Sequence, residues 1–467
     1  MKALPAWARE FAHQYGSKTA NLYILHGNIR DFFPYTSRDD EYLFARLQDY
    51  ISDALFSGED IIIYYDRSGG VSFGAESLAR DYIAALKQRC PDAEPAEFIA
   101  ADPVKSFAFL EKYILFKILQ DQREKRRIVL IVDYAETIAP AGDLGGLSGG
   151  DRSILVTLSR WAWDAAFTQG DVSILLLAEN LDGIAPLLTD SPAVVKVHIP
   201  LPNEELRTAF LRRQEREGKL FLGNGVSPER AAAATGGLSL VSLNRLVSEG
   251  SGETKPLTLE YVRQRKKELI ERETLGLLDF PQTGPALSYA AGHSFVKKRL
   301  KNAVRAVKMG RPDMLPAGYL IAGPGGTGKS FMVRAFAAEA GIPLARLNLS
   351  RQQGCAPAIL EKALNILIAM APAAALVDDA DLFLKNAAGG CSSGGYSSGR
   401  FIAQVSGLMG REYRGRLIWF FITSRPDRIP AYLKRRGLLE ERLTLFNPGT
   451  DKECEALFNA LVRKLNL

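Results

Sequence analysis

The residues with the clearest chemical signature are the eight of GPGGTGKS, at positions 323–330. They fit the pattern G-x-x-x-x-G-K-[ST], and they stand between an apolar run that predicts a strand and a segment that predicts a helix, as the pattern requires. Glycines let backbone N–H groups turn toward a phosphate, and the helix N-terminus and Lys329 add positive charge. The hydroxyl of Ser330 is a suitable ligand for Mg²⁺. We therefore predict that nucleotide phosphates are bound by Gly323, Pro324, Gly325, Gly326, Thr327, Gly328, Lys329 and Ser330.

Three aspartates follow another apolar run, in the stretch AALVDDADLF at 374–383. Where a phosphate loop is present, an acid at the end of a neighbouring buried strand holds the magnesium ion, and Asp378 takes this place. Asp379 would face the terminal phosphate, where a carboxylate orients or deprotonates the attacking water. The alternative for Asp379 and for Asp381 is a cap on the following helix. We prefer the catalytic role for Asp379 and the cap for Asp381.

Apolar runs alternate with helix-forming segments through both halves of the chain, which predicts an α/β fold with parallel sheets. In the second half the predicted strands are 318–323, 344–350, 373–377, 416–423 and 442–446. In the first half they are 21–25, 60–66, 128–133, 172–178 and 195–201. Because the order of elements repeats, we predict two tandem P-loop-type modules. We expect a helical lid after the first module, and an absent or truncated lid after the second.

These elements suggest boundaries for the domains. The predicted parts are an N-terminal arm at 1–20, a first α/β core at 21–202, a helical lid and connecting helix at 203–273, a linker at 274–287, and a second core with the start of a lid at 288–467. The linker is placed at a polar stretch that contains proline and glycine.

The bulk composition sets further limits. The chain has 467 residues, too many for one hydrophobic core, and a net charge of +6, which is small for this length. The basic clusters at 124–127, 263–267 and 434–436 lack interleaved aromatic residues, so solvated helix faces are favoured over a nucleic-acid surface. The four cysteines are scattered without CxxC spacing, which favours a reducing cytoplasm over a zinc site or a disulfide framework. We predict no signal peptide and no membrane span, because the N-terminus lacks an apolar core and the most apolar stretch, 364–377, is too short.

Residues 288–447 resemble the ATPase module of the AAA subfamily of AAA+ proteins. The resemblance is carried by YAAGHSFVKKRLKNAVRAVKMGRPDMLPAGYLIAGPGGTGKS, then by APAAALVDDADLF, then by WFFITSRPDRIPAYLKRRG. It implies ATP and Mg²⁺ as cofactors, with the adenine held by the backbone at Ala291 and Gly292. It also places Asp378 and Asp379 on the Walker B pair of this family.

The same resemblance implies a homo-oligomer, with a hexameric ring as one form, in which an arginine of one subunit acts at the site of its neighbour. The candidates for this arginine finger are Arg435 and Arg436, with Arg442 as a third.

The chain departs from the family pattern within the site itself. Asp379 stands where the family has glutamate, and its shorter side chain reaches less far toward water. Ser424, in TSRP, stands at sensor 1, where asparagine is usual. The substrate-gripping pore loop corresponds to RQQG, 351–354, which lacks the usual aromatic residue. These departures predict slow turnover and argue against threading of a polypeptide through a central pore.

The first half resembles a degenerate AAA+ module. HGN, at 26–28, follows a predicted strand where a phosphate loop would be, and no GK[ST] comes after it. Asp133 and Asn180 take positions like those of a Walker B acid and a sensor 1 residue. We predict that this half is a structural or partner-binding domain that has lost nucleotide.

Three functions are open on these grounds. The first is an ATP-binding, ATP-hydrolysing AAA ATPase that remodels or assembles a protein complex. The second is a slow nucleotide-dependent switch or scaffold with little turnover. The third is a nucleic-acid-associated AAA+ protein, which the mild charge and the absence of a recognisable nucleic-acid module do not favour. The protein partner is unknown, and neither membrane nor nucleic acid is expected among the partners.

Overall fold

The computed structural model divides the chain into two compact units. The first comprises Met1–Leu201 with Ser239–Val241, and the second Pro202–Leu238 with Ser242–Leu467. The structure describes residues 4–36, 42–56, 60–119, 126–142, 145–250, 256–282, 284–348, 357–381, 395–410, 413–435 and 437–465.

The first unit is organised around a six-stranded sheet with the order β5-β4-β6-β7-β1-β8. Its strands are β1 (Leu22–Gly27), β4 (Ile61–Asp66), β5 (Gly70–Phe73), β6 (Ile128–Val132), β7 (Val172–Ala178) and β8 (Val194–Ile199). Neighbouring strands are parallel, except that β5 pairs antiparallel with β4. Strands β6 and β7 are buried along their whole length, because their Ile, Val and Leu side chains are covered on both faces of the sheet.

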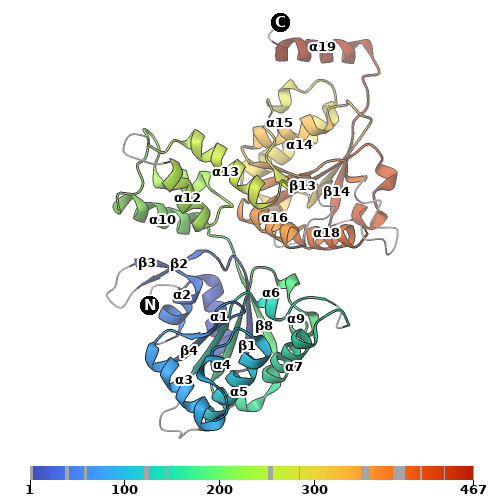
Figure 1. Cartoon of the computed structure of the whole chain (residues 1–467). Helices are drawn as coiled ribbons and strands as arrows, with labels where there is room; N and C mark the ends of the chain where they lie inside the picture. Colours follow the sequence, from blue (N-terminus) through green and yellow to red (C-terminus); the bar gives the residue numbers. More distant parts are fainter. Residues whose placement is uncertain are drawn as a thin grey trace. The chain divides into compact units, whose positions relative to one another are not determined.

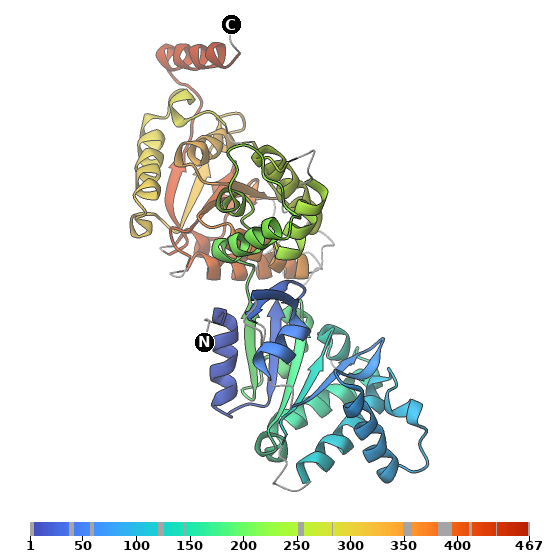
Figure 2. The ribbon, with the colours of Figure 1, turned by 90° about the vertical axis from the view of Figure 1, so that its left-hand side faces the viewer.

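Helices cover both faces of this sheet (Figure 2). They are α1 (Ala6–Gly16), α2 (Leu47–Tyr50), α3 (Glu76–Arg89), α4 (Pro95–Phe98), α5 (Pro103–Leu119), α6 (Ala135–Ile138), α7 (Gly149–Trp163), α8 (Ala165–Gln169) and α9 (Pro186–Thr189). Apolar side chains of α3, α5 and α7 pack on one face, and those of α1 and α2 pack on the other. A separate antiparallel pair, β2 (Phe32–Thr36) with β3 (Tyr42–Arg46), was not predicted.

The five parallel strands of the second sheet repeat the order of those in the first. The full order of the second sheet is β14-β10-β13-β12-β11-β9. The strands are β9 (Leu278–Asp279), β10 (Gly318–Ala322), β11 (Leu344–Leu347), β12 (Ala373–Val377), β13 (Leu417–Thr423) and β14 (Leu439–Thr444). Five strands are parallel, and β9 adds an antiparallel edge to β11 as β5 does to β4. The prediction of two tandem α/β modules with parallel sheets is thereby confirmed.

The second sheet also lies between two layers of helices (Figure 1). The helices of these layers are α14 (Ser294–Lys308), α15 (Lys329–Ala340), α16 (Pro357–Ala369) and α18 (Gly395–Leu408), and α19 (Asp451–Leu465) comes after β14 in the chain. Helices α14 and α15 lie on one face, and α16 and α18 lie on the other. Side chains of α14 and α15 share one buried cluster with Leu344 of β11 and with alternate residues of β12 and β13. This packing fixes the start of α15 against the carboxyl ends of the strands.

The predicted helical lid consists of α10 (Glu204–Arg216), α11 (Pro228–Ala234), α12 (Leu240–Gly250) and α13 (Leu259–Glu273). Apart from residues 239–241, this segment belongs to the second unit. Lys362 of α16 forms an ion pair with Glu273 at the end of α13, with 3.2 Å between Nζ and Oε2. Strand β9 follows α13 directly, so the segment that leaves the lid becomes the edge strand of the second sheet.

No helix among the residues that the structure describes is both long enough and apolar enough to cross a membrane.

Candidate active site

The loop between β10 and α15 depends on glycine. A Cβ atom on Gly323 would lie 2.4 Å from the carbonyl oxygen of Leu445, closer than any side chain can approach. Gly326 and Gly328 have φ angles of 82° and 87°, in the left-handed region that favours glycine. Helix α15 begins at Lys329. The loop therefore has the strand–glycine–helix arrangement that places backbone N–H groups around a phosphate.

Lys329 is the buried cation of this loop, with 9% of its surface exposed. Its Nζ donates to the carbonyl oxygens of Gly323 and Pro324, at 2.7 and 2.8 Å, and to Oγ of Ser424 at 3.4 Å. Ser424 immediately follows β13, the strand that neighbours β10. The structure thus brings the predicted phosphate lysine and the predicted sensor 1 residue together.

Ser330, at the start of α15, contacts Asp378. The Ser330 hydroxyl donates to Oδ2 of Asp378 at 3.2 Å. Asp378 directly follows β12, and its position is set by the parallel pairing of β12 with β13 and β11. A hydroxyl and a carboxylate at this separation are the hard oxygen donors that Mg²⁺ prefers. The residues present therefore fit a magnesium ion, which Ser330 and Asp378 would hold.

Asp379 has a left-handed backbone conformation, which is uncommon for a residue other than glycine. Its φ is 48°, and its N–H donates to Oδ1 of Asp378 at 3.1 Å. Left-handed non-glycine residues carry strain of about 1–3 kcal/mol and are found preferentially at functional sites. Burial raises the pKa of the Asp379 carboxyl, and the negative charges of Asp378 and Asp381 raise it further. A carboxylate with a raised pKa is a stronger base than an ordinary aspartate.

The prediction that Asp381 caps a helix is wrong. Residues 380 and 381 are already helical, and Asp381 is buried. Its Oδ1 accepts a hydrogen bond of 2.6 Å from the hydroxyl of Thr423, the last residue of β13. The backbone N–H of Arg425 donates to the same Thr423 hydroxyl at 2.9 Å. Asp381 thus ties the segment after β12 to the segment that carries Ser424.

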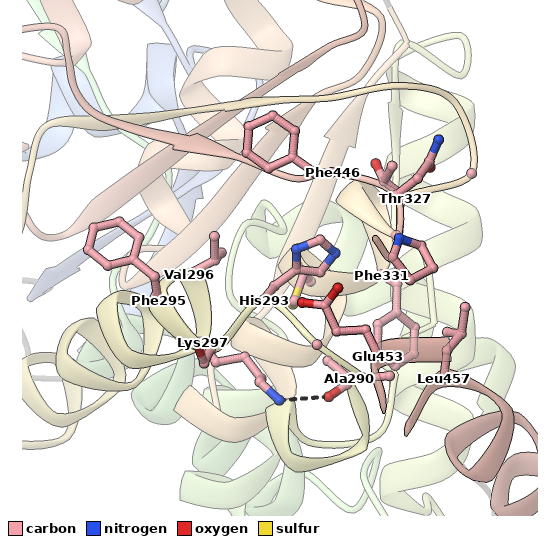
Figure 3. Close-up of a pocket in the computed structure, with 18 of the residues that line it drawn as sticks. Ala290, His293, Phe295, Val296, Lys297, Thr327, Phe331, Phe446, Glu453 and Leu457 are labelled. Carbon is pink, nitrogen blue, oxygen red and sulfur yellow. Dashed lines mark hydrogen bonds between the residues drawn. The ribbon is translucent and has the colours of Figure 1, made fainter. Parts of the chain in front are cut away.

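A cavity of about 880 Å³ opens beside the phosphate loop (Figure 3). The predicted adenine residues Ala291 and Gly292 line it together with Gly326, Thr327 and Gly328 of the loop. The structure therefore places the predicted base contacts and the predicted phosphate contacts around one space, whose size suits a small-molecule ligand.

Other residues around this cavity were not predicted. His293, Lys297, Phe446 and Glu453 line it, and Figure 3 shows them around the same space. Lys297 of α14 donates to the carbonyl oxygen of Ala290 at 3.0 Å. Phe446 follows β14, and Glu453 lies in α19. These residues carry no motif, and they come together only because α14, the end of β14 and α19 meet at the loop.

The arginine candidates lie elsewhere in the second unit. Arg435 is exposed and lies in the segment between β13 and β14. Arg442 is exposed on β14, and its guanidinium donates to the carbonyl oxygen of Lys434. Arg436 and the predicted pore-loop residues 351–354 lie outside the described residues.

The first unit has the same backbone geometry after its central strand, but with different side chains. Asp133 follows β6 as Asp378 follows β12, and the next residue, Tyr134, has a φ of 51°. The Tyr134 N–H donates to Oδ1 of Asp133 at 2.7 Å. A Cβ on Gly27, the last residue of β1, would lie 2.6 Å from the carbonyl oxygen of Ile199, as a Cβ on Gly323 would lie close to that of Leu445. These matches identify Asp133 as the counterpart of Asp378.

The carboxylate of Asp133 is paired with an arginine, whereas that of Asp378 accepts a hydrogen bond from a serine hydroxyl. The Arg30 guanidinium donates to Oδ2 of Asp133 at 2.8 Å, and the Gln48 amide donates to the same oxygen at 2.8 Å. Arg30 also lies over the Tyr134 ring, 4.0 Å from its centroid, and forms an ion pair with Glu179. Arg30 comes from the segment that replaces the phosphate loop. The cation at this carboxylate is thus part of the chain.

Three curated relatives each match part of the chain. The chain is 26% identical over 309 residues to an uncharacterized AAA domain-containing protein, ycf46, of Guillardia theta, which covers 63% of this chain and 58% of the relative. It is 25% identical over 231 residues to the ATP-dependent zinc metalloprotease FtsH 2 of Salinibacter ruber, covering 47% and 32%. It is 30% identical over 156 residues to the ATPase family gene 2 protein homolog B of Mus musculus, covering 32% and 21%. The chain therefore spans between about a fifth and three fifths of the length of these relatives.

Family models match three consecutive parts of the chain. Residues 1–200 match the N-terminal Rossmann-like domain of an AAA+ chaperone, and residues 205–275 match its second helical domain. Residues 319–446 match the ATPase family associated with various cellular activities. The phosphate loop, the aspartates after β12 and the segment after β13 all fall within the last match. The chain belongs to the AAA+ ATPases, with an AAA domain in its second half.

Proposed function

We propose that the second module binds ATP with Mg²⁺ and hydrolyses it, and that the chain uses this cycle to remodel or assemble a protein complex. The observation that carries the proposal is the convergence of Lys329, Ser330, Asp378 and Ser424 at one glycine-dependent loop beside the cavity. The matches to AAA+ chaperone domains over residues 1–200 and 205–275 support a role in acting on other proteins. We also propose a cytoplasmic location, which the scattered cysteines support.

Each residue of the site has a role in this proposal. The backbone at Ala291 and Gly292 holds the adenine, and Lys329 and the loop N–H groups bind the phosphates. Ser330 and Asp378 would hold Mg²⁺, which neutralises phosphate charge when it is bound. Asp379, with its raised pKa, accepts the proton of the attacking water. The Ser424 hydroxyl, next to Lys329, orients that water.

Replacing the phosphate lysine tests the site assignment. We expect Lys329→Ala to weaken ATP binding by about tenfold or more in titration calorimetry, since hydrogen bonds to a charged group contribute about 1.5–3 kcal/mol. Lys362→Ala is a suitable control, because Lys362 is half exposed and pairs with Glu273. Unchanged ATP affinity in Lys329→Ala would show that the site is misassigned.

We further propose that the active form is a homo-oligomer, with a hexameric ring as one form, in which Arg435 or Arg436 reaches the site of the neighbouring subunit. Ring assembly is usual among AAA+ proteins, and Arg435 is exposed. Turnover per chain should then rise with protein concentration, in step with the mass measured by light scattering. The arginine assignment is refuted by a variant with Arg435→Ala and Arg436→Ala that keeps the wild-type rate and concentration dependence.

A second candidate function is a slow nucleotide-dependent switch or scaffold. It is favoured by the short, strained Asp379 and by Ser424, whose hydroxyl lies 3.4 Å from Lys329 Nζ. Both side chains reach less far than the glutamate and asparagine that are usual in the family.

If the two short side chains limit the rate, the double change Asp379→Glu and Ser424→Asn should raise kcat by about tenfold or more, because positioning of the water contributes at least that factor. ATP affinity should change little, since Lys329 and the loop are untouched. Steady-state ATPase kinetics measure both quantities. A kcat that stays at the wild-type value would contradict the idea that these residues slow the enzyme.

A further inference from the structure

An arginine lies close to the proposed magnesium ligand. Arg346 of β11 is the register partner of Leu376 of β12, and Asp378 comes two residues after Leu376. Leu376 packs in the buried cluster with α14 and α15, and Asp378, just after β12, accepts a hydrogen bond from Ser330 of α15, so Arg346 and Asp378 lie on the same side of the sheet. The pKa of Arg346 is raised, first by its hydrogen bonds to Asp279 and then by the charges of Asp279 and Asp378. A long guanidinium side chain can span the distance between such diagonal neighbours.

Asp279 holds this arginine. Arg346 Nε and Nη2 donate to the Oδ1 and Oδ2 atoms of Asp279, at 3.0 and 2.6 Å, which is the bidentate geometry of a strong ion pair. The two residues are also direct partners in the antiparallel pairing of β9 with β11. Asn348 supports the pair, because its Nδ2 donates to Oδ2 of Asp279 at 2.8 Å and its N–H donates to the carbonyl oxygen of Leu277 at 2.8 Å.

The first module shows what an arginine does at the corresponding carboxylate. There the Arg30 guanidinium donates to Asp133 at 2.8 Å. An arginine at Asp378 would occupy the same lone pairs that Mg²⁺ needs, and its charge cannot be removed near neutral pH. The two modules therefore differ in whether an arginine reaches the aspartate after the strand.

We propose that Asp279 is a positioning residue of the magnesium site: it holds Arg346 and so keeps that guanidinium off Asp378. This inference rests on the proposed function, because it concerns the metal that accompanies ATP. Asp279 belongs to β9, which follows the last helix of the lid, so the segment that joins the lid to the ATPase core supplies the residue. The Asp279–Arg346 pair joins β9 to β11.

The test is a titration with Mg²⁺ at a fixed concentration of a slowly hydrolysed ATP analogue, in which the rise in melting temperature is measured. A parallel titration with ATP measures turnover. In Asp279→Ala, Arg346 is released to Asp378, and we expect the Mg²⁺ concentration at half effect to rise about tenfold. Arg346→Ala should keep the wild-type midpoint. The double variant Asp279→Ala with Arg346→Ala should also have the wild-type Mg²⁺ midpoint, although it lacks the ion pair just as Asp279→Ala does.

A matched control is available at the opposite edge of the same sheet. Glu440 of β14 pairs with Arg414 at 2.8 Å, and their side chains are 20% and 38% exposed, against 20% and 39% for Asp279 and Arg346. Glu440→Ala should cost similar stability and leave the Mg²⁺ midpoint unchanged. If Asp279→Ala does not fold, Asp279→Asn replaces it, since the amide keeps the shape and loses the charge.

The outcomes separate this inference from the function on which it rests. A wild-type chain that shows no Mg²⁺-dependent nucleotide binding contradicts the proposed function. A wild type that binds normally, with an unchanged midpoint in Asp279→Ala, contradicts the positioning role alone. A raised midpoint that persists in the double variant also overturns it, because Asp279 would then act through the fold and not through Arg346.

Discussion

The carboxylate at the carboxyl end of a central strand requires a positively charged partner, and the two modules differ in how they supply it. Asp133 is buried and receives the guanidinium of Arg30, which comes from the chain itself. Asp378 is only partly buried, and it accepts a hydrogen bond from the Ser330 hydroxyl. A buried or half-buried carboxylate without a cation is costly. In the first module Arg30 supplies the cation, and in our proposal a bound metal ion supplies it in the second.

The rest of the second module serves the geometry around Asp378. Parallel pairing of β12 with β13 sets Asp378 beside the segment that carries Ser424, and the buried Asp381–Thr423 hydrogen bond fixes these two segments to each other. Packing of α15 on the sheet brings Lys329 and Ser330 to the same edge. The lid of the first module belongs to this unit as well, through the Glu273–Lys362 ion pair and through β9. The chain therefore joins the lid of one module to the core of the next.

Much of this could be predicted from sequence. The long apolar strands were found because a parallel sheet buried on both faces needs continuous runs of Ile, Val and Leu. The phosphate loop and Asp378 were found because they are local in sequence. The edge strands β5 and β9 and the β2–β3 pair were missed, since short edge strands lack such runs. The Asp381–Thr423 hydrogen bond, the Asp279–Arg346 pair and the cavity residues His293 and Glu453 were also missed, because their partners are far away in the chain and only the packed fold brings them together.

The most direct test of the account is the number of ATP molecules that bind per chain, measured by calorimetry in the presence of Mg²⁺. If Arg30 completes the first module and the second module holds the nucleotide, about one molecule binds per chain, and Lys329→Ala reduces that number toward zero at the same concentrations. Two molecules per chain, or one that binds undiminished in Lys329→Ala, would contradict the account, because the nucleotide would then occupy a site that the structure closes with an arginine.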